Sequence, residues 1–105
     1  MNSFKALVDR AADRANLNVA NPVATNALGL IVHTMVECGQ LKLPKGALQT
    51  VAEVLKDRTG HTYSGGSLRW YRVMLSKDPE FVARFMTLPE GYQMLVRDGQ
   101  ANGAS

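Results

Sequence analysis

A chain of 105 residues with 46% hydrophobic and 20% charged residues has the length and composition of one globular domain. These values exclude an intrinsically disordered chain, and a single cysteine, Cys38, excludes an intrachain disulfide framework. The formal net charge of +3 is unevenly placed, because residues 42–77 hold seven basic and only two acidic side chains. Such an excess suggests a basic face for a polyanion, although a solvated surface is an equally good explanation.

Five to six short helices are predicted from apolar residues that recur at helical spacing. The first is expected over residues 4–16 and the second from Asn21-Pro22 to Gly39, with Asn21 as its N-cap. After a connector at 41–44, a third helix begins at Lys45 and stops at Gly60. The remaining helices are a fourth capped by Ser64 and running to about Lys77, a short fifth after Asp78-Pro79, and a sixth from Pro89 to Gly99.

These elements predict an all-α fold, a small bundle in which residues 1–98 form a single domain. The tail 99–105 has nothing to bury and is expected to be disordered. The side chains expected in the core are Leu28, Ile31, Met35, Val51, Leu55, Leu68 and Leu75.

The fourth helix is amphipathic in a way that indicates a binding role. A helical wheel places its apolar residues on one arc and the arginines Arg69 and Arg72, one turn apart, on the opposite arc. Arginine can donate two parallel hydrogen bonds to guanine or hold a phosphate. A helix that packs by one face and presents two arginines outward suits the DNA major groove.

The run 51–55, a turn containing Gly60, and the run 64–72 resemble the helix-turn-helix unit of small DNA-binding regulators. The match covers about 30 residues, and its turn is longer than the family pattern because Ala52 and Leu68 are sixteen positions apart. In that family the second helix reads bases with its N-terminal residues. The resemblance implies that Ser64, Ser67, Arg69 and Arg72 contact DNA, that Ala52 is the small residue where the helices touch, and that Leu68 is an apolar anchor.

On this basis we expect a small protein that binds double-stranded DNA, a transcriptional regulator of phage or plasmid type. The other basic residues near the fourth helix, Lys56, Arg58 and Lys77, are further candidate contacts. We expect a homodimer, since one short helix buries little surface.

The alternative is a helical protein-interaction module, an inhibitor or adaptor. Trp70 and Tyr71 diverge by 100° on the helix, so both cannot reach the centre of one core, and an exposed Trp beside arginines is typical of a protein interface. A Trp at the edge of the core is the simpler interpretation of the same pattern.

No catalytic, metal or cofactor site is predicted. His33 and Glu37 share a helix face, but Cys38 points elsewhere, which leaves too few ligands for zinc. Nothing orients a base beside a nucleophile, so we expect no enzymatic activity. The charged N-terminus and the absence of a long apolar run predict neither secretion nor membrane insertion, and a lone cysteine favours the cytoplasm.

Overall fold

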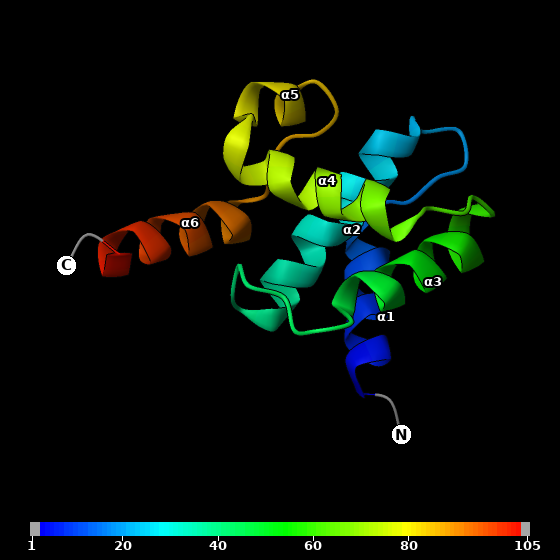
Figure 1. Ribbon diagram of the computed structural model, residues 1–105, viewed down its shortest axis with the longest axis horizontal. Helices are drawn as coiled ribbons and strands as arrows, with labels where there is room; N and C mark the ends of the chain where they lie inside the picture. Colours follow the sequence, from blue (N-terminus) through cyan, green and yellow to red (C-terminus); the bar gives the residue numbers. More distant parts are fainter. Residues whose placement is uncertain (1–2, 104–105) are drawn as a thin grey trace.

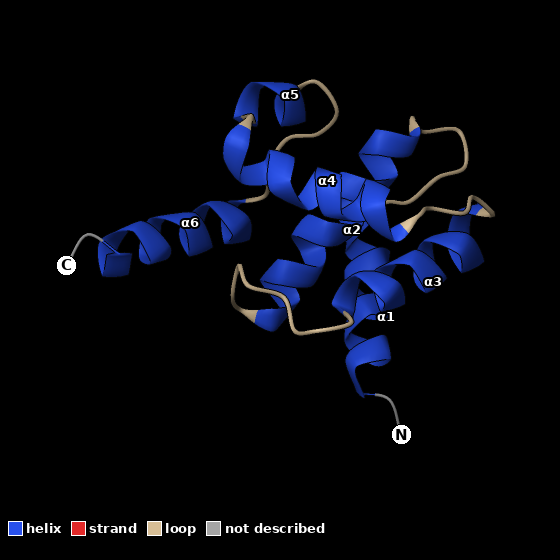
Figure 2. Ribbon diagram, in the orientation of Figure 1, coloured by secondary structure: helices blue, strands red, loops and turns tan. Residues whose placement is uncertain are grey.

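The computed structural model describes the backbone of residues 3–103 and the burial of the side chains of residues 4–99. Within this part the chain is all-α, with no strand, which confirms the predicted fold class (Figures 1 and 2). The helices are α1 (Ser3–Ala15), α2 (Val23–Cys38), α3 (Ala47–Thr59), α4 (Gly65–Lys77), α5 (Pro79–Ala83) and α6 (Glu90–Gly103).

Most helix ends carry the capping chemistry that their sequence indicates. Ser64 precedes α4, and its Oγ accepts a hydrogen bond of 3.0 Å from the backbone N–H of Ser67. Asp78 caps α5 in the same way, accepting from the N–H of Phe81 at 3.0 Å. The ends of α2 and α3 lie at Gly39 and Gly60, both left-handed, where glycine has no Cβ to clash.

Three predicted boundaries are wrong. Asn21 does not cap α2, because its side-chain amide donates to the Oδ1 of Asn26 at 3.1 Å and Pro22 takes the cap position. α3 begins two residues after Lys45, since Gly46 has a positive φ of 82° that no helix accommodates. α6 does not stop at Gly99 but continues to Gly103. The expected disorder of the tail 99–105 stays a prediction. Residues 104–105 of the predicted tail lie outside the described residues.

The core is built around α2, which contacts α1, α3, α4 and α6. α1 covers one side of α2 with Val8, Ala11 and Ala12, all buried. The seven residues predicted for the core are all buried, which confirms that part of the helical pattern. α6 extends away from the rest of the molecule, as Figure 1 shows, and begins against α2 where Gly91 faces Val36.

The turn between α3 and α4 is fixed by local hydrogen bonds and by a buried tyrosine. Thr59 Oγ1 donates to the carbonyl of Leu55 at 2.7 Å and accepts from the N–H of His61 at 3.2 Å. Tyr63, the residue before the N-cap of α4, is only 7% exposed, and its hydroxyl donates to the carbonyl of Val23 at 2.8 Å. The entry to α4 is therefore tied to the start of α2.

Among the described residues no helix is long and apolar enough to cross a membrane. The same part of the chain holds no group of three or more His, Cys, Asp or Glu residues arranged to bind a metal ion.

Candidate functional site

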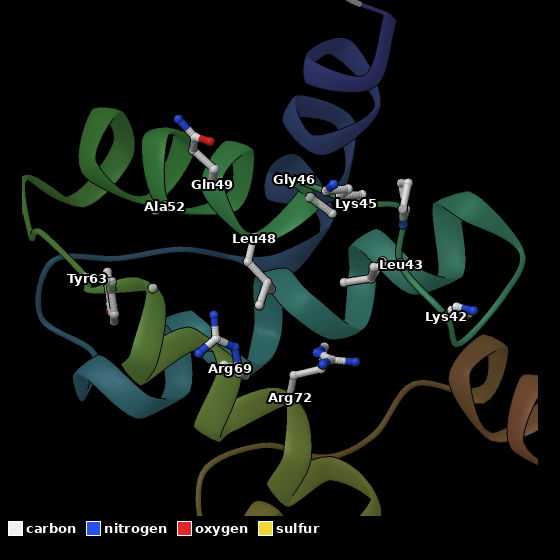
Figure 3. Close-up of a pocket in the computed structure, with 13 residues that line it drawn as sticks. Lys42, Leu43, Lys45, Gly46, Leu48, Gln49, Ala52, Tyr63, Arg69 and Arg72 are labelled. Atoms are coloured by element: carbon white, nitrogen blue, oxygen red, sulfur yellow. The ribbon is translucent and has the colours of Figure 1, made fainter.

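A groove of about 720 Å³ lies between α4 and the segment that leads into α3. We call it the basic groove. One wall carries Lys42 and Lys45 of the segment 42–49, and the other is the face of α4 that carries Gly65, Arg69 and Arg72. Leu43, Leu48, Ala52 and Tyr63 complete the lining between these charged residues. In Figure 3 the Arg69 side chain rises from α4 towards Leu48 and the Arg72 side chain extends on the side of Leu43, while Lys42 and Lys45 come from the opposite wall.

All the charged residues that line the basic groove are positive. They are Lys42, Lys45, Arg69 and Arg72, and no acidic residue is among its lining. Within the part of the chain that the structure describes, none of the four forms an ion pair. Four cations that face one concavity without a carboxylate raise the local positive potential and concentrate anions there.

The lysine wall of the groove owes its shape to backbone chemistry. Pro44 excludes a helical conformation from Leu43, and Gly46 provides the left-handed residue that starts α3. Lys42 and Lys45 therefore lie on an exposed connector that forms this wall of the groove. The first turn of α3 begins at this wall without a side-chain cap, and the amides of Ala47 and Gln49 donate instead to the backbone carbonyls of Pro44 and Gly46.

Between the cations the lining of the groove is apolar. It contains Leu43 and Leu48, both partly exposed, together with Ala52. The ring of Tyr63 lies at the end of this lining but is largely buried, and burial raises the pKa of its hydroxyl to about 12. The groove therefore combines charged walls with an uncharged floor.

The outward face of α4 adjoins the groove. Leu68 and Leu75 are buried, and Gly66, Arg69, Trp70 and Lys77 are exposed. Trp70 is 48% exposed, and its ring packs edge to face on Tyr71 and Phe81 with centroid distances of 5.3 and 5.2 Å. Tyr71 is half-buried beneath it, so only one of the two aromatics is a surface residue.

The remaining predicted contact residues fall in different environments. Ser64 and Ser67 are exposed, and their hydroxyl groups form a hydrogen bond with an Oγ to Oγ distance of 2.9 Å. Both side chains therefore take part in capping the start of α4. Lys56 is exposed on α3, and its Nζ donates to Thr62 Oγ1 at 2.9 Å. Lys77 is exposed in the last turn of α4.

Arg58 is separated from this group by its partners. Its Nη1 donates to Asp13 Oδ1 at 2.8 Å and its Nη2 lies 3.7 Å from Asp9 Oδ1, both on α1. The hydrogen bond to Asp13 raises the pKa of Arg58. Arg58 does not line the basic groove, and its charge is offset locally, so we leave it out of the site.

Sequence analysis missed Lys42 and Lys45 as site residues. It counted both in the basic segment, but the segment around them looked like a plain connector. The charge excess was the available signal, and only the fold shows that these lysines line the same groove as Arg69 and Arg72.

The titratable residues of α2 are not among the residues that line the groove. The pKa of His33 is lowered by partial burial and by nearby Arg14, and burial raises the pKa of the Cys38 thiol. A lowered pKa favours the neutral form of the His33 imidazole over its cation.

No model of a known protein family matches this chain, and neither curated proteins nor solved structures include a significant match.

Proposed function

We propose that this protein binds double-stranded DNA, with α4 as the helix that enters the major groove. The observation that carries the proposal is the basic groove beside α4, whose lining contains four cations and no acidic residue. An α-helix is about 10–12 Å across, which matches the roughly 12 Å width of the major groove. A helix seated there has a phosphodiester strand along each flank, and the basic groove lies along one flank of α4.

The cations would divide into two roles. Arg69 lies at the edge between the outward face of α4 and the groove, where a planar guanidinium can reach a guanine edge. Arg72, Lys42 and Lys45 line the groove itself and would contact phosphates. Phosphate contacts fix the register of the helix, whereas Arg69 would contribute sequence preference.

The first turn of α4 supports close approach to DNA. An added Cβ at Gly65 would meet nothing within 4 Å, and at Gly66 only Ser64 Oγ at 4.0 Å. A phosphate or base edge can thus approach the exposed backbone here without meeting a side chain. We further propose that the protein binds as a homodimer and regulates transcription, since one helix contributes little contact area.

The experiment is a titration of the full chain with random-sequence duplex DNA at several salt concentrations. Each phosphate neutralised releases counterions, so three or four phosphate contacts predict a logarithmic salt slope of about −3 to −4. No duplex binding at roughly 50 mM salt, where non-specific electrostatic binding is strong, would refute the proposal.

The exposure of Trp70 favours one second candidate, a protein-interaction surface centred on that side chain. The ring of Trp70 packs edge to face on Tyr71 and Phe81, and these contacts would make it a rigid aromatic anchor. If the duplex titration fails, a protein partner captured by the wild type and lost on Trp70→Ala, with the helical fold intact, would support this function instead.

A further inference from the structure

The apolar floor of the basic groove has no use in contacting a phosphodiester strand. The sugar-phosphate backbone presents charged oxygens to a protein, and cations alone satisfy them. Leu43, Leu48 and Ala52 nevertheless lie between the two charged walls, and Leu43 and Leu48 retain exposed surface. Exposed apolar side chains inside a concave charged site fit a ligand that has an uncharged flat part as well as an anionic part.

The size of the groove is that of a small-molecule site. Its volume of about 720 Å³ falls within the roughly 300–1,000 Å³ usual for ligand pockets. Cations come from both walls, Lys42 and Lys45 from the connector and Arg69 and Arg72 from α4, so a ligand that extends along the groove can contact cations of both walls. An inorganic anion would use these charges and leave the floor uncovered.

We propose that the basic groove is a binding site for a free nucleotide. The phosphates contact the lysine and arginine side chains, and the base lies on Leu43, Leu48 and Ala52. Bidentate contacts from Arg69 and Arg72 suit phosphate oxygens, and the lysines add point charges.

This site has a consequence that rests on the proposed function. Arg69 and Arg72 belong both to the groove and to the face of α4 proposed to contact DNA. A nucleotide in the groove would occupy both guanidinium groups, so nucleotide and duplex would exclude each other. The nucleotide would therefore act as a competitive regulator of DNA binding.

The first test is calorimetric titration of the full chain with ATP, inorganic tripolyphosphate and adenosine, all without divalent metal. Binding of tripolyphosphate measures the contribution of the cations alone, and binding of adenosine measures the contribution of the apolar floor alone. We expect ATP to bind at least tenfold more tightly than tripolyphosphate, because the base buries the apolar floor. Equal affinities for ATP and tripolyphosphate would overturn the nucleotide site.

Matched variants locate the binding. Lys45→Ala removes a cation from the groove, and Lys56→Ala removes the same charge from an exposed position on α3 outside the lining. Because Lys45→Ala loses one charge-assisted contact, we expect its affinity for ATP to fall roughly tenfold, whereas Lys56→Ala should change the affinity less than about twofold. Arg72→Ala is the second groove variant, with the fold of each checked by circular dichroism. Equal weakening in the groove and control variants would contradict the assignment.

A competition titration with labelled duplex separates this proposal from the proposed function. ATP that displaces bound duplex supports both. ATP binding with the stated variant pattern, but no duplex binding, leaves the nucleotide site standing and removes the DNA function. Duplex binding that ATP does not disturb overturns the nucleotide site alone.

Discussion

The cations around α3 and α4 fall into two regions with different electrostatic surroundings. On the side towards α1, Arg58 is held by Asp13 and Asp9, which come from a helix 45 to 49 positions earlier in the chain. On the side towards the connector 42–46, Arg69 and Arg72 line one groove with Lys42 and Lys45 and have no acidic partner in the described structure.

Both regions belong to the same basic stretch of sequence, and a count of charges cannot separate them. The acids that neutralise Arg58 lie outside that stretch and reach it only through the packing of α1 on α3. The groove side keeps its full charge, which is why it is the better candidate for binding a polyanion. The expected effects of substitutions follow from this division.

The largest effect is expected on the free energy of unfolding, from a change in the buried face of α4. Leu68 lies on the buried face of α4 and is fully buried, so Leu68→Ala should lower the free energy of unfolding by about 2–5 kcal/mol. Chemical denaturation followed by circular dichroism measures this. A loss below about 1 kcal/mol would mean that α4 is oriented differently and that the groove is not built as described.

Sequence alone was sufficient for that buried face. Leu68 and Leu75 recur at helical spacing, and Ser64, Gly60 and Asp78-Pro79 mark helix ends with side-chain or backbone chemistry that acts over a few residues. Local rules of this kind are readable from one sequence. The contact of Tyr63 with Val23 spans 40 positions and has no such signal.

The next effect concerns the two arginines on the groove side. Arg69→Ala should cost about 1–3 kcal/mol for a preferred sequence and less for random duplex, because a base contact is lost. Arg72→Ala should weaken all duplexes alike and flatten the salt slope by about one unit. Fluorescence anisotropy with selected and random duplexes distinguishes these results. If both variants behave like the wild type, α4 is not the DNA-binding helix.

A smaller effect is expected at alkaline pH from Tyr63, which ties α4 to α2. Burial raises its pKa to about 12 in the folded protein, above the value of 10 in the unfolded chain. Below pH 10 both states are protonated and this contribution to stability is complete. Between pH 10 and 12 the unfolded chain ionises first, so stability should fall, by on the order of 2 kcal/mol. Tyr63→Phe should lack this component in urea titrations, and an identical pH profile for the two proteins would contradict it.

The smallest effect is expected for the paired cation. Arg58→Ala should reduce stability by only about 0.3–1 kcal/mol, because the side chain is 36% exposed and solvent screens its ion pairs. The loss should shrink as salt rises. Duplex affinity should remain within about twofold of wild type. A loss of affinity as large as that of Arg72→Ala would remove the distinction between the two regions.

Long-range pairing explains why the candidate site was only half predicted. Arg69 and Arg72 stand on a helix face that a wheel can display, so both were found. Lys42 and Lys45 lie on a connector whose direction depends on Pro44, on Gly46 and on the packing of α2 against α4. Whether a cation is paired depends on contacts between distant helices, as Arg58 shows.

The salt dependence of duplex binding by Lys42→Ala/Lys45→Ala tests the central claim most directly. These lysines enter the site through the fold alone, and the variant removes two groove cations without touching α4. We predict a salt slope about two units shallower than that of the wild type and weaker binding to every duplex, with circular dichroism unchanged. A slope equal to that of the wild type would show that the basic groove does not contact the DNA backbone.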